Sequence, residues 1–208
     1  MQGKFVFFCS LTILLLAGSI AVGQTFEISS PDQSMAAGSG AIPFSATFSI
    51  EQVTGALEDT KGFSFAYGHD PTLLEVLGSS PFTPTSVGVL AGVNDGDGPD
   101  FIQGEIFVDG FTVGVIYALV DQTQVITYEV AKPVIEVNYA TLPGAVDGIT
   151  EDVVTDIIHA DDLGTPPAAT VVVIGEGTSA ETTALPFSIT FQAAPPVPDP
   201  VFVISAQD

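Results

Sequence analysis

The sequence predicts an all-β protein built as a two-sheet antiparallel β-sandwich. Apolar residues recur at every second position in several segments, which is the pattern of strands with one buried face. Helical periodicity is nearly absent. The apolar runs are short, and Gly, Pro, Asn and Asp, which favour turns, separate them. Runs of this length and spacing are typical of a sandwich rather than of alternating strands and helices.

The first clear strands lie in the N-terminal third of the chain. In residues 42–50 the large apolar side chains share one face, and the serine and threonine side chains share the other. This segment therefore predicts a strand with one buried face. Phe63, Phe65 and Tyr67 repeat the pattern, so we expect their aromatic rings to lie in the core.

A hairpin is expected near the middle of the chain. Residues 101–108 form one predicted strand, and Asp109-Gly110 is a residue pair typical of tight hairpin turns. The returning strand, residues 111–120, has apolar or small residues on both faces. We expect it to be central in the sandwich, with Leu119 on its inner face.

Further short strands and one helical turn complete the predicted domain. Asp70 suits an N-cap and Pro71 suits the first helical position, so a single helical turn is expected near residues 70–75. The later strands are β-branched or aromatic runs at residues 124–130, 134–139, 153–158, 170–174 and 187–191.

The N-terminus has the layout of a secretory signal peptide. Lys4 precedes an uncharged apolar run, and Ala21 and Gly23 are small residues where signal peptidase requires them. The alternative is an uncleaved anchor, for which the run is only just long enough. Cleavage after Gly23 divides the chain into a signal peptide with a helical core, a β-sandwich domain and a Pro-rich C-terminal tail, at residues 1–23, 24–192 and 193–208. The mature protein would have no transmembrane segment and would be secreted, extracellular or at the cell surface.

The chain is strongly acidic. It has 25 Asp and Glu against 3 Lys and Arg, a formal net charge of −22, and loss of Lys4 with the signal peptide would make it −23. Such a charge repels phosphate backbones, so no nucleic acid is expected as a partner. The charge indicates either a saline or calcium-containing habitat or a role in solubility alone. Cys9, the single cysteine, lies within the predicted signal peptide, so no disulfide would stabilise the exported domain.

Two segments resemble the cohesin-like modules of secreted bacterial proteins. They are residues 62–75, a strand followed by an Asp-Pro turn and leucines, and residues 134–139, which resemble a later core strand of the family. Residues 109–115 and 162–167 resemble segments of exported modules of this type. The resemblance covers most of the mature chain. It implies a jelly-roll β-sandwich, related to some carbohydrate-binding modules, with a non-catalytic role in adhesion or scaffold assembly.

The residues offer little for catalysis. His69 and His159 are the only histidines, and no nucleophile elbow or metal-type histidine spacing accompanies them. We interpret both as turn or edge residues, with a catalytic base as the weaker alternative. A pair of acidic residues acting in hydrolysis would leave no local signature. We expect that the protein is not an enzyme and requires no cofactor.

One loop is a candidate calcium site. Asp95, Asp97 and Asp100 alternate with glycine and proline on a segment that could wrap a hard cation. The spacing is not that of an EF-hand, because Ile106 stands where the closing Glu would be. A solvated acidic loop is the competing interpretation. A second acidic cluster with weaker spacing, open to the same two interpretations, comprises Glu151, Asp152, Asp156, Asp161 and Asp162.

Two kinds of extracellular partner follow from these observations. We expect a secreted binding or adhesion module that mediates protein–protein or cell-surface association, and polysaccharide binding is the alternative. Carbohydrate binding typically needs exposed flat aromatic rings, but tryptophan is absent, and only Tyr128 and Tyr139 fall at positions that could be open. Exposed coplanar aromatics would favour a sugar, and a flat polar sheet face would favour a protein.

Overall fold

The computed structural model describes residues 23–195, and strands dominate this range. Nearly all of the predicted signal peptide and most of the predicted tail lie outside the described residues. No helix among residues 23–195 is long and apolar enough to cross a membrane. The elements in chain order are β1 (Thr25–Ser29), β2 (Gln33–Ala36), β3 (Pro43–Thr54), β4 (Thr60–Gly68), β5 (Leu74–Val76), β6 (Thr85–Ser86), α1 (Gly88–Ala91), η1 (Asn94–Gly96), β7 (Phe101–Phe107), β8 (Gly110–Ile116), β9 (Lys132–Thr141), β10 (Val153–His159), β11 (Val171–Ile174), β12 (Thr178–Ala184) and β13 (Phe187–Gln192).

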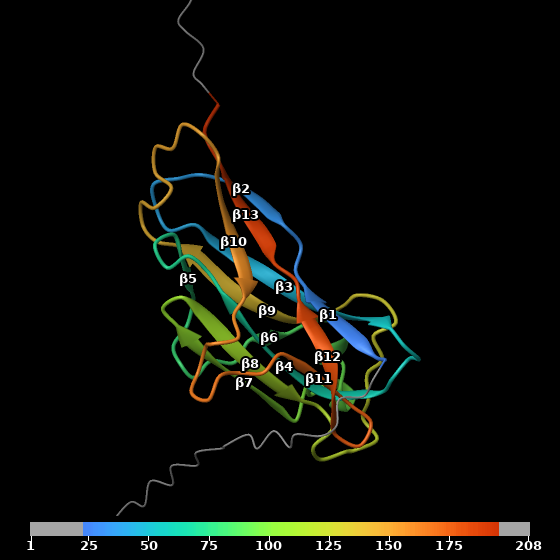
Figure 1. Ribbon diagram of the computed structural model, residues 1–208. Helices are drawn as coiled ribbons and strands as arrows, with labels where there is room; N and C mark the ends of the chain where they lie inside the picture. Colours follow the sequence, from blue (N-terminus) through green and yellow to red (C-terminus); the bar gives the residue numbers. More distant parts are fainter. Residues whose placement is uncertain (1–22, 196–208) are drawn as a thin grey trace, which may run out of the picture.

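The strands form two layers with the core between them (Figure 1). One layer runs β5-β9-β3-β1, and β6 also pairs with β9. The other runs β7-β8-β4, and β4 then pairs with β10 near one end and with β11 near the other. β12 pairs with both β11 and β1, so it joins the two layers along one side of the sandwich.

Two strand pairs depart from the expected antiparallel arrangement. β1 pairs with β12 in parallel, and β2 pairs with β13 in parallel. Parallel neighbours need a long crossover connection, and here each pair joins a strand near the start of the chain to one near its end. The predicted all-β sandwich is therefore confirmed with mixed rather than purely antiparallel pairing.

Aromatic rings fill the centre of the core. Phe48 of β3 is fully buried, and its ring centroid lies 4.9 Å from that of Tyr67, 5.4 Å from Phe65, 5.6 Å from Phe111 and 5.7 Å from Phe187. These separations are in the range of favourable tilted and edge-to-face ring pairs. The rings come from both layers, so they hold the two sheets together.

Tyr67 also connects the layers through its hydroxyl group. Its side chain is fully buried, and its Oη donates to either of two main-chain acceptors, the Ile28 carbonyl oxygen at 3.1 Å and the Leu185 carbonyl oxygen at 3.0 Å. Burial raises the pKa of Tyr67 above its ordinary value, so the phenol keeps the proton it donates.

Several predicted elements appear where expected. The strand predicted at residues 42–50 lies within β3, and those predicted at 134–139 and 153–158 lie within β9 and β10. The Asp70 turn closes through Leu74 N–H donating to the Asp70 carbonyl oxygen at 2.9 Å, and Asp70 Oδ1 accepts from Thr72 N–H at 2.8 Å. This is one hydrogen-bonded turn that leads directly into β5.

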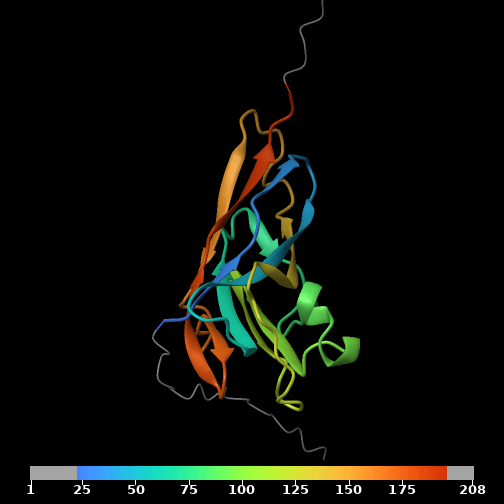
Figure 2. The ribbon, with the colours of Figure 1, turned by 90° about the vertical axis from the view of Figure 1, so that its right-hand side faces the viewer.

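Two local predictions are wrong, and two short elements were not predicted. The strand predicted at 111–120 ends at Ile116, so Leu119 is 60% exposed instead of facing the core. Residues 124–130 form no strand, and only an isolated bridge joins Ile126 to Thr60. The short helical segments α1 and η1 were not predicted. They protrude from the side of the sandwich, as Figure 2 shows.

Candidate interaction surface

The outer side of β7, β8, β4 and β11 forms a continuous sheet face that we call the neutral face. Phe63, Phe65 and Tyr67 of β4 are buried in the core, so the residues between them point outward. The same alternation holds in β8 and β11. The register aligns these outward residues in four rows across the strands, which are Phe101-Ile116-Gly62-Val173, Gln103-Gly114-Ser64-Val171, Glu105-Thr112-Ala66 and Phe107-Gly110-Gly68-Ile158.

The neutral face differs in charge from the rest of this acidic molecule. Its four rows carry a single carboxylate, on Glu105 at the β7 edge. The outer side of the opposite layer carries four, interspersed with serine and threonine, at Glu27, Glu51, Glu75 and Glu136. A further carboxylate, Glu181, lies on the joining strand β12 beside Val171 at the edge of the neutral face. Depletion of charged residues is typical of the buried part of a protein interface. In a chain with 25 acidic residues, this nearly uncharged face is the clearest candidate interaction surface.

The centre of the neutral face is built from small residues. Gly62 and Ser64 of β4 lie beside Gly114 of β8, with the apolar Ile116, Val171 and Val173 around them. Glycine inside a strand often marks a place where another backbone approaches closely. Gly62 is itself buried, whereas Ser64, Gly114 and the apolar side chains around them are half-buried, so the accessible part of this strip is small and partly apolar.

A segment that we call the strap, residues 160–169, covers one end of the neutral face. The Ala160 N–H donates to the Ala66 carbonyl oxygen at 3.2 Å, and Ser64 Oγ donates to the Ala169 carbonyl oxygen at 2.5 Å. Leu163 is 8% exposed and packs where Gly110 has no side chain, because a Cβ there would lie 2.6 Å from Leu163 Cδ1. The strap therefore reaches as far as Ser64 of the Gln103 row, and it leaves the Phe101 row and the β7 and β8 part of the Gln103 row uncovered.

An acidic pocket of about 480 Å³ lies beside the start of the strap. Gly68 and Ile158, which belong to the last row of the neutral face, also line the pocket, so the pocket adjoins the face. The charged and titratable residues that line it are Asp70, Asp109, Asp156, Asp161, Asp162, His69 and His159. The structure thus brings together both histidines and three members of the second acidic cluster, and it adds Asp70 and Asp109. Glu151 and Asp152 do not line the pocket.

His69 is the unusual residue of this pocket. It is 7% exposed, and neither ring nitrogen has a hydrogen-bond partner among the described residues. Burial lowers the pKa of His69 below its ordinary value of 6.5, although the nearby Asp109 carboxylate acts in the opposite direction. His69 is therefore neutral at pH 7, and its ring packs edge-on against Tyr139 in the core, with 5.8 Å between the ring centroids.

His159 is exposed, and its Nε2 lies 2.9 Å from Thr170 Oγ1. This contact ties the end of β10 to the residue just before β11, on either side of the strap. Within residues 23–195, no carboxylate forms a hydrogen bond to the ring, so the pair lacks, in this part of the chain, the third group that orients a catalytic base. The contact accounts for His159 as a structural residue.

The three candidate calcium ligands lie in a different part of the molecule, around η1. Asp95 and Asp97 are exposed. Asp100 Oδ2 accepts hydrogen bonds from the Leu119 N–H at 2.7 Å and the Val120 N–H at 2.9 Å, and Asp100 Oδ1 accepts from Asn94 Nδ2 at 3.2 Å. Among the described residues, no three His, Cys, Asp or Glu side chains are grouped so as to hold a metal ion. Calcium binding here stays a prediction.

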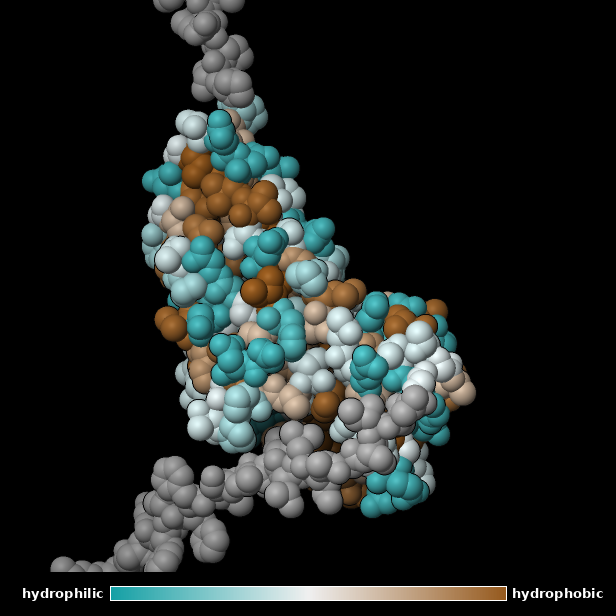
Figure 3. All heavy atoms as spheres, in the orientation of Figure 1, coloured by the Kyte–Doolittle hydropathy of each residue, from teal (hydrophilic) through white to brown (hydrophobic). Residues whose placement is uncertain are grey.

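Within residues 23–195, no aromatic side chain is among the large apolar groups exposed at the surface, as carbohydrate binding would need. Tyr128 and Tyr139, the two tyrosines that the sequence placed at positions that could be exposed, are both fully buried. Tyr67 and Tyr117 are fully buried as well. Burial raises the pKa of Tyr117 to about 12. The large apolar side chains exposed within residues 23–195 are all valine, leucine or isoleucine. Figure 3 shows such apolar surface gathered where β10 begins, and Val154 of that strand is 60% exposed. These observations do not support the polysaccharide alternative.

The fold is that of the cohesin modules. No family model and no curated protein matches the sequence. A type I cohesin from Clostridium thermocellum, solved in complex with a dockerin, superposes with a TM-score of 0.56 over 85% of this chain and 97% of that one, at 7% identity. A type II cohesin from the cellulosome of Acetivibrio cellulolyticus gives 0.55 over 80% and 94%, at 14% identity. The third cohesin of ScaC, in complex with the ScaB dockerin from the same organism, gives 0.54 over 82% and 99%, at 15% identity.

Proposed function

We propose that this protein is an extracellular, non-catalytic module that binds a protein partner on its neutral face. The observation that carries the proposal is the charge distribution, since one continuous sheet face is nearly free of carboxylates in a chain of net charge −22. The cohesin-like fold supports a protein partner, because similar modules were solved with dockerin proteins bound. The apolar leader of the sequence supports export.

The partner test uses charge on the neutral face. Partners are first captured from the culture medium and cell envelope of the source organism, then purified and titrated against the protein. We expect the double substitution Ile116→Glu and Val173→Glu to weaken binding at least tenfold, because it places two carboxylates in the apolar row across β8, β4 and β11.

The matched control is Thr47→Glu with Ser49→Glu, which adds the same charge to the outward side of β3. This pair should leave the affinity within twofold of the unchanged protein. Equal losses in both variants would show that net charge, and not the neutral face, governs binding. Failure to capture any partner that binds after purification would contradict the proposal itself.

Export is tested by the N-terminus of the mature protein. If the chain is secreted as proposed, mass spectrometry of the culture medium will find a species that begins at Gln24. A full-length chain that begins at Met1 and stays with the membrane fraction would support the anchor alternative.

A further inference from the structure

We propose that Leu119 and Val120, which we call the apolar tip, form an anchor that enters an apolar cleft on the protein partner. The tip lies in the loop between β8 and β9. The inference rests on the proposed function, because the tip continues the uncovered end of the neutral face. It adds the chemistry that the partner must offer there, namely a concave surface lined by aliphatic or aromatic side chains.

The first argument is that the tip exposes two large apolar side chains that are neighbours in the sequence. Leu119 is 60% exposed and Val120 is 84% exposed, the largest fraction of any large apolar residue within residues 23–195. Single exposed apolar residues are normal on a protein surface, whereas contiguous apolar surface marks interaction sites. The other exposed large apolar residues in this part of the chain stand singly in the sequence.

The second argument is that the loop is held in shape before any partner binds. A single carboxylate oxygen, Asp100 Oδ2, accepts from the Leu119 N–H at 2.7 Å and from the Val120 N–H at 2.9 Å. Asn94 Nδ2 donates to Asp100 Oδ1 at 3.2 Å and to the Gly98 carbonyl oxygen at 2.8 Å. Binding therefore removes little backbone freedom at the tip, which favours affinity.

The third argument is that the tip adjoins the part of the neutral face that the strap leaves uncovered. Ile116 ends β8 and pairs with Phe101, the first residue of β7, and Val173 of β11 lies in the same row. All three side chains are half-buried. Asp100, which binds the tip, directly precedes Phe101. A partner that covers the Phe101 row therefore meets apolar surface that continues into the tip.

The carboxylate next to the tip is already satisfied. Asp121 follows Val120, and its Oδ1 accepts from the Thr123 N–H at 2.9 Å and from Thr123 Oγ1 at 2.7 Å. A partner can cover the tip while this exposed carboxylate stays in water at the rim. An apolar anchor beside a polar rim is the usual arrangement of a protein interface.

A protein cleft suits the tip better than a lipid surface. Peripheral membrane sites combine apolar side chains with Lys and Arg, which anionic lipids attract. This chain has 3 Lys and Arg against 25 Asp and Glu. Its net charge of −22 repels anionic lipids.

The first experiment needs no partner protein, because it uses β-cyclodextrin as a host with a small apolar cavity. The host is titrated into the isotope-labelled chain from Gln24 to Asp208, which contains every described strand, and amide chemical shifts are followed. We expect saturable shifts centred on residues 118–121. Maltoheptaose, an open chain of the same sugar units, is the control and should cause none. Shifts centred on other residues, no shifts, or equal shifts with maltoheptaose would each overturn the inference.

The second experiment measures affinity for the partner that is captured from the medium or envelope and purified. Leu119→Asn with Val120→Thr keeps the approximate size of both side chains and makes them polar. This pair should weaken binding at least tenfold, because two apolar side chains no longer favour burial. The free energy of unfolding should stay unchanged, because both side chains are exposed.

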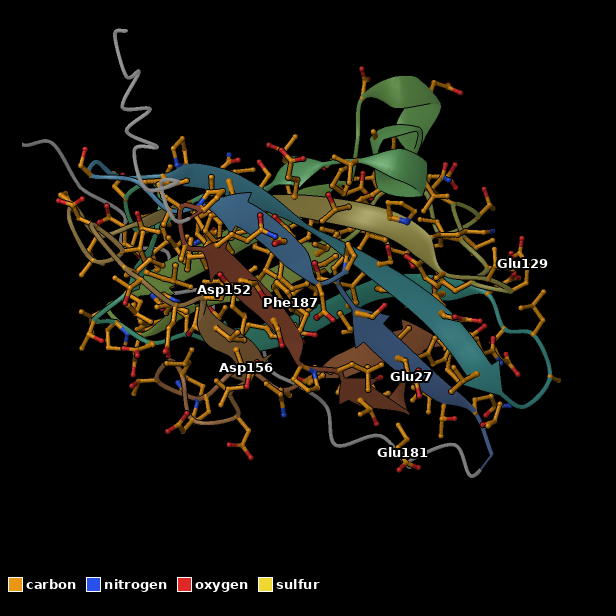
Figure 4. All side chains as sticks on the ribbon, turned by 90° about the horizontal axis from the view of Figure 1, so that it is seen from above. Glu27, Glu129, Asp152, Asp156, Glu181 and Phe187 are labelled. Atoms are coloured by element: carbon orange, nitrogen blue, oxygen red, sulfur yellow. The ribbon has the colours of Figure 1, made fainter. Side chains whose placement is uncertain are left out.

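The matched control is Leu77→Asn with Val154→Thr, which makes the same chemical change at residues that are 41% and 60% exposed. Figure 4 shows Asp152 and Asp156, which flank Val154 in the sequence, well apart from Glu129 of the loop that carries the tip. The control pair should leave the affinity within twofold of the unchanged protein. Equal weakening by both pairs would overturn the inference.

The positioning role of Asp100 is tested by Asp100→Asn. This substitution should weaken partner binding severalfold in the unchanged protein and have no further effect once Leu119 and Val120 are polar, because the two changes act through one contact. An equal effect in both backgrounds would contradict a tip that Asp100 holds in place for binding.

Sedimentation with vesicles of phosphatidylcholine and phosphatidylglycerol tests the lipid alternative. We expect the protein to stay in the supernatant. Sedimentation that depends on Leu119 and Val120 would overturn the inference.

The outcomes also separate this inference from the proposed function. A partner whose binding is weakened by Ile116→Glu with Val173→Glu, but not by substitution of the tip, would overturn the inference and leave the proposed function intact. Shifts centred on the tip with β-cyclodextrin, with no protein partner found, would support the chemistry of the tip and contradict the proposed function.

Discussion

Phe48 is the side chain on which the contact between the two layers most depends. It is fully buried and lies within 5.7 Å, centroid to centroid, of four other aromatic rings. Phe48→Ala removes these contacts and leaves a cavity, so we expect the free energy of unfolding to fall by about 3–5 kcal/mol. Chemical denaturation monitored by tyrosine fluorescence measures the change. Ser49→Ala, on the outward side of the same strand, should change it by less than about 0.5 kcal/mol.

His69 makes stability depend on pH. Burial lowers its pKa in the folded protein below 6.5, so the unfolded chain takes up the proton first as the pH falls. The contribution of neutral His69 to the free energy of unfolding is therefore complete above pH 6.5. It is lost as the pH falls through 6.5 toward the folded-state pKa. We expect His69→Phe to remove this dependence, which cannot exceed about 1.4 kcal/mol per pH unit for one proton.

The measurement is the free energy of unfolding of both proteins at several pH values from 7.5 to 5.5. The difference between them should stay level from pH 7.5 to about 6.5 and then change in favour of the phenylalanine variant as the pH falls further. His159→Gln is the control, because His159 is exposed. A constant difference between the His69→Phe variant and the unchanged protein would contradict the assignment.

At the scale of elements, Asp100 fixes the loop that follows β8. Its carboxylate accepts from two main-chain N–H groups, at Leu119 and Val120, and from the Asn94 side chain. Hydrogen bonds to a charged acceptor contribute more than neutral ones. We expect Asp100→Ala to lower the free energy of unfolding by about 1–3 kcal/mol with or without calcium.

Thermal melting of the Asp100→Ala and Asp97→Ala variants, each with calcium and with a chelator, tests this assignment and the calcium prediction together. Asp97 is exposed, so its substitution should matter only if calcium binds. An unchanged melting midpoint of the parent protein in calcium and in chelator would refute the calcium prediction.

The elements also show which parts of the fold the sequence can predict. β3, β4 and β9 were predictable because their apolar residues alternate over many positions. β12 was not, since its sequence Thr-Ser-Ala-Glu-Thr-Thr-Ala has only two small apolar residues, which face inward between β11 and β1. Burial of Tyr128, in a segment without regular strand pairing, depends on tertiary packing that no local pattern records.

The candidate surface was predictable only in part. His69, His159 and the second acidic cluster were identified one by one, but the pocket joins positions from 69 to 162 through the pairing of β4 with β8 and β10. The neutral face could have been anticipated, because the outward positions of β4 and β8 are Gly, Ser, Ala and Thr. Such alternation of aromatic and small residues is the signal to look for.

At the scale of the whole molecule, charge opposes the fold. The chain has a formal net charge of −22, and Lys132–Glu129 is the one ion pair within residues 23–195. Screening by salt weakens the repulsion among carboxylates. We therefore expect the melting temperature to rise between about 10 mM and 1 M salt, where the Debye length shortens from about 30 Å to 3 Å.

Scanning calorimetry in sodium chloride and in potassium chloride measures this rise, and equal effects of the two salts would indicate screening rather than specific binding. A gain of about 1 kcal/mol corresponds to roughly 2–4 °C for a chain of this size. A melting temperature that stays constant or falls over this range would show that repulsion does not limit stability.

The parallel pairing of β1 with β12 also governs when the fold can form. β1 begins at Thr25 and its partner ends at Ala184, so this edge of the sandwich stays open until almost the entire chain is present. Pairings between distant residues form slowly, because the chain loses the entropy of closing a long loop before the new contacts stabilise it. A chain emerging from a ribosome or a membrane channel is therefore exposed to proteases and chaperones until its last strands have emerged. Only then can β12 pair with β1 and close this edge of the sandwich.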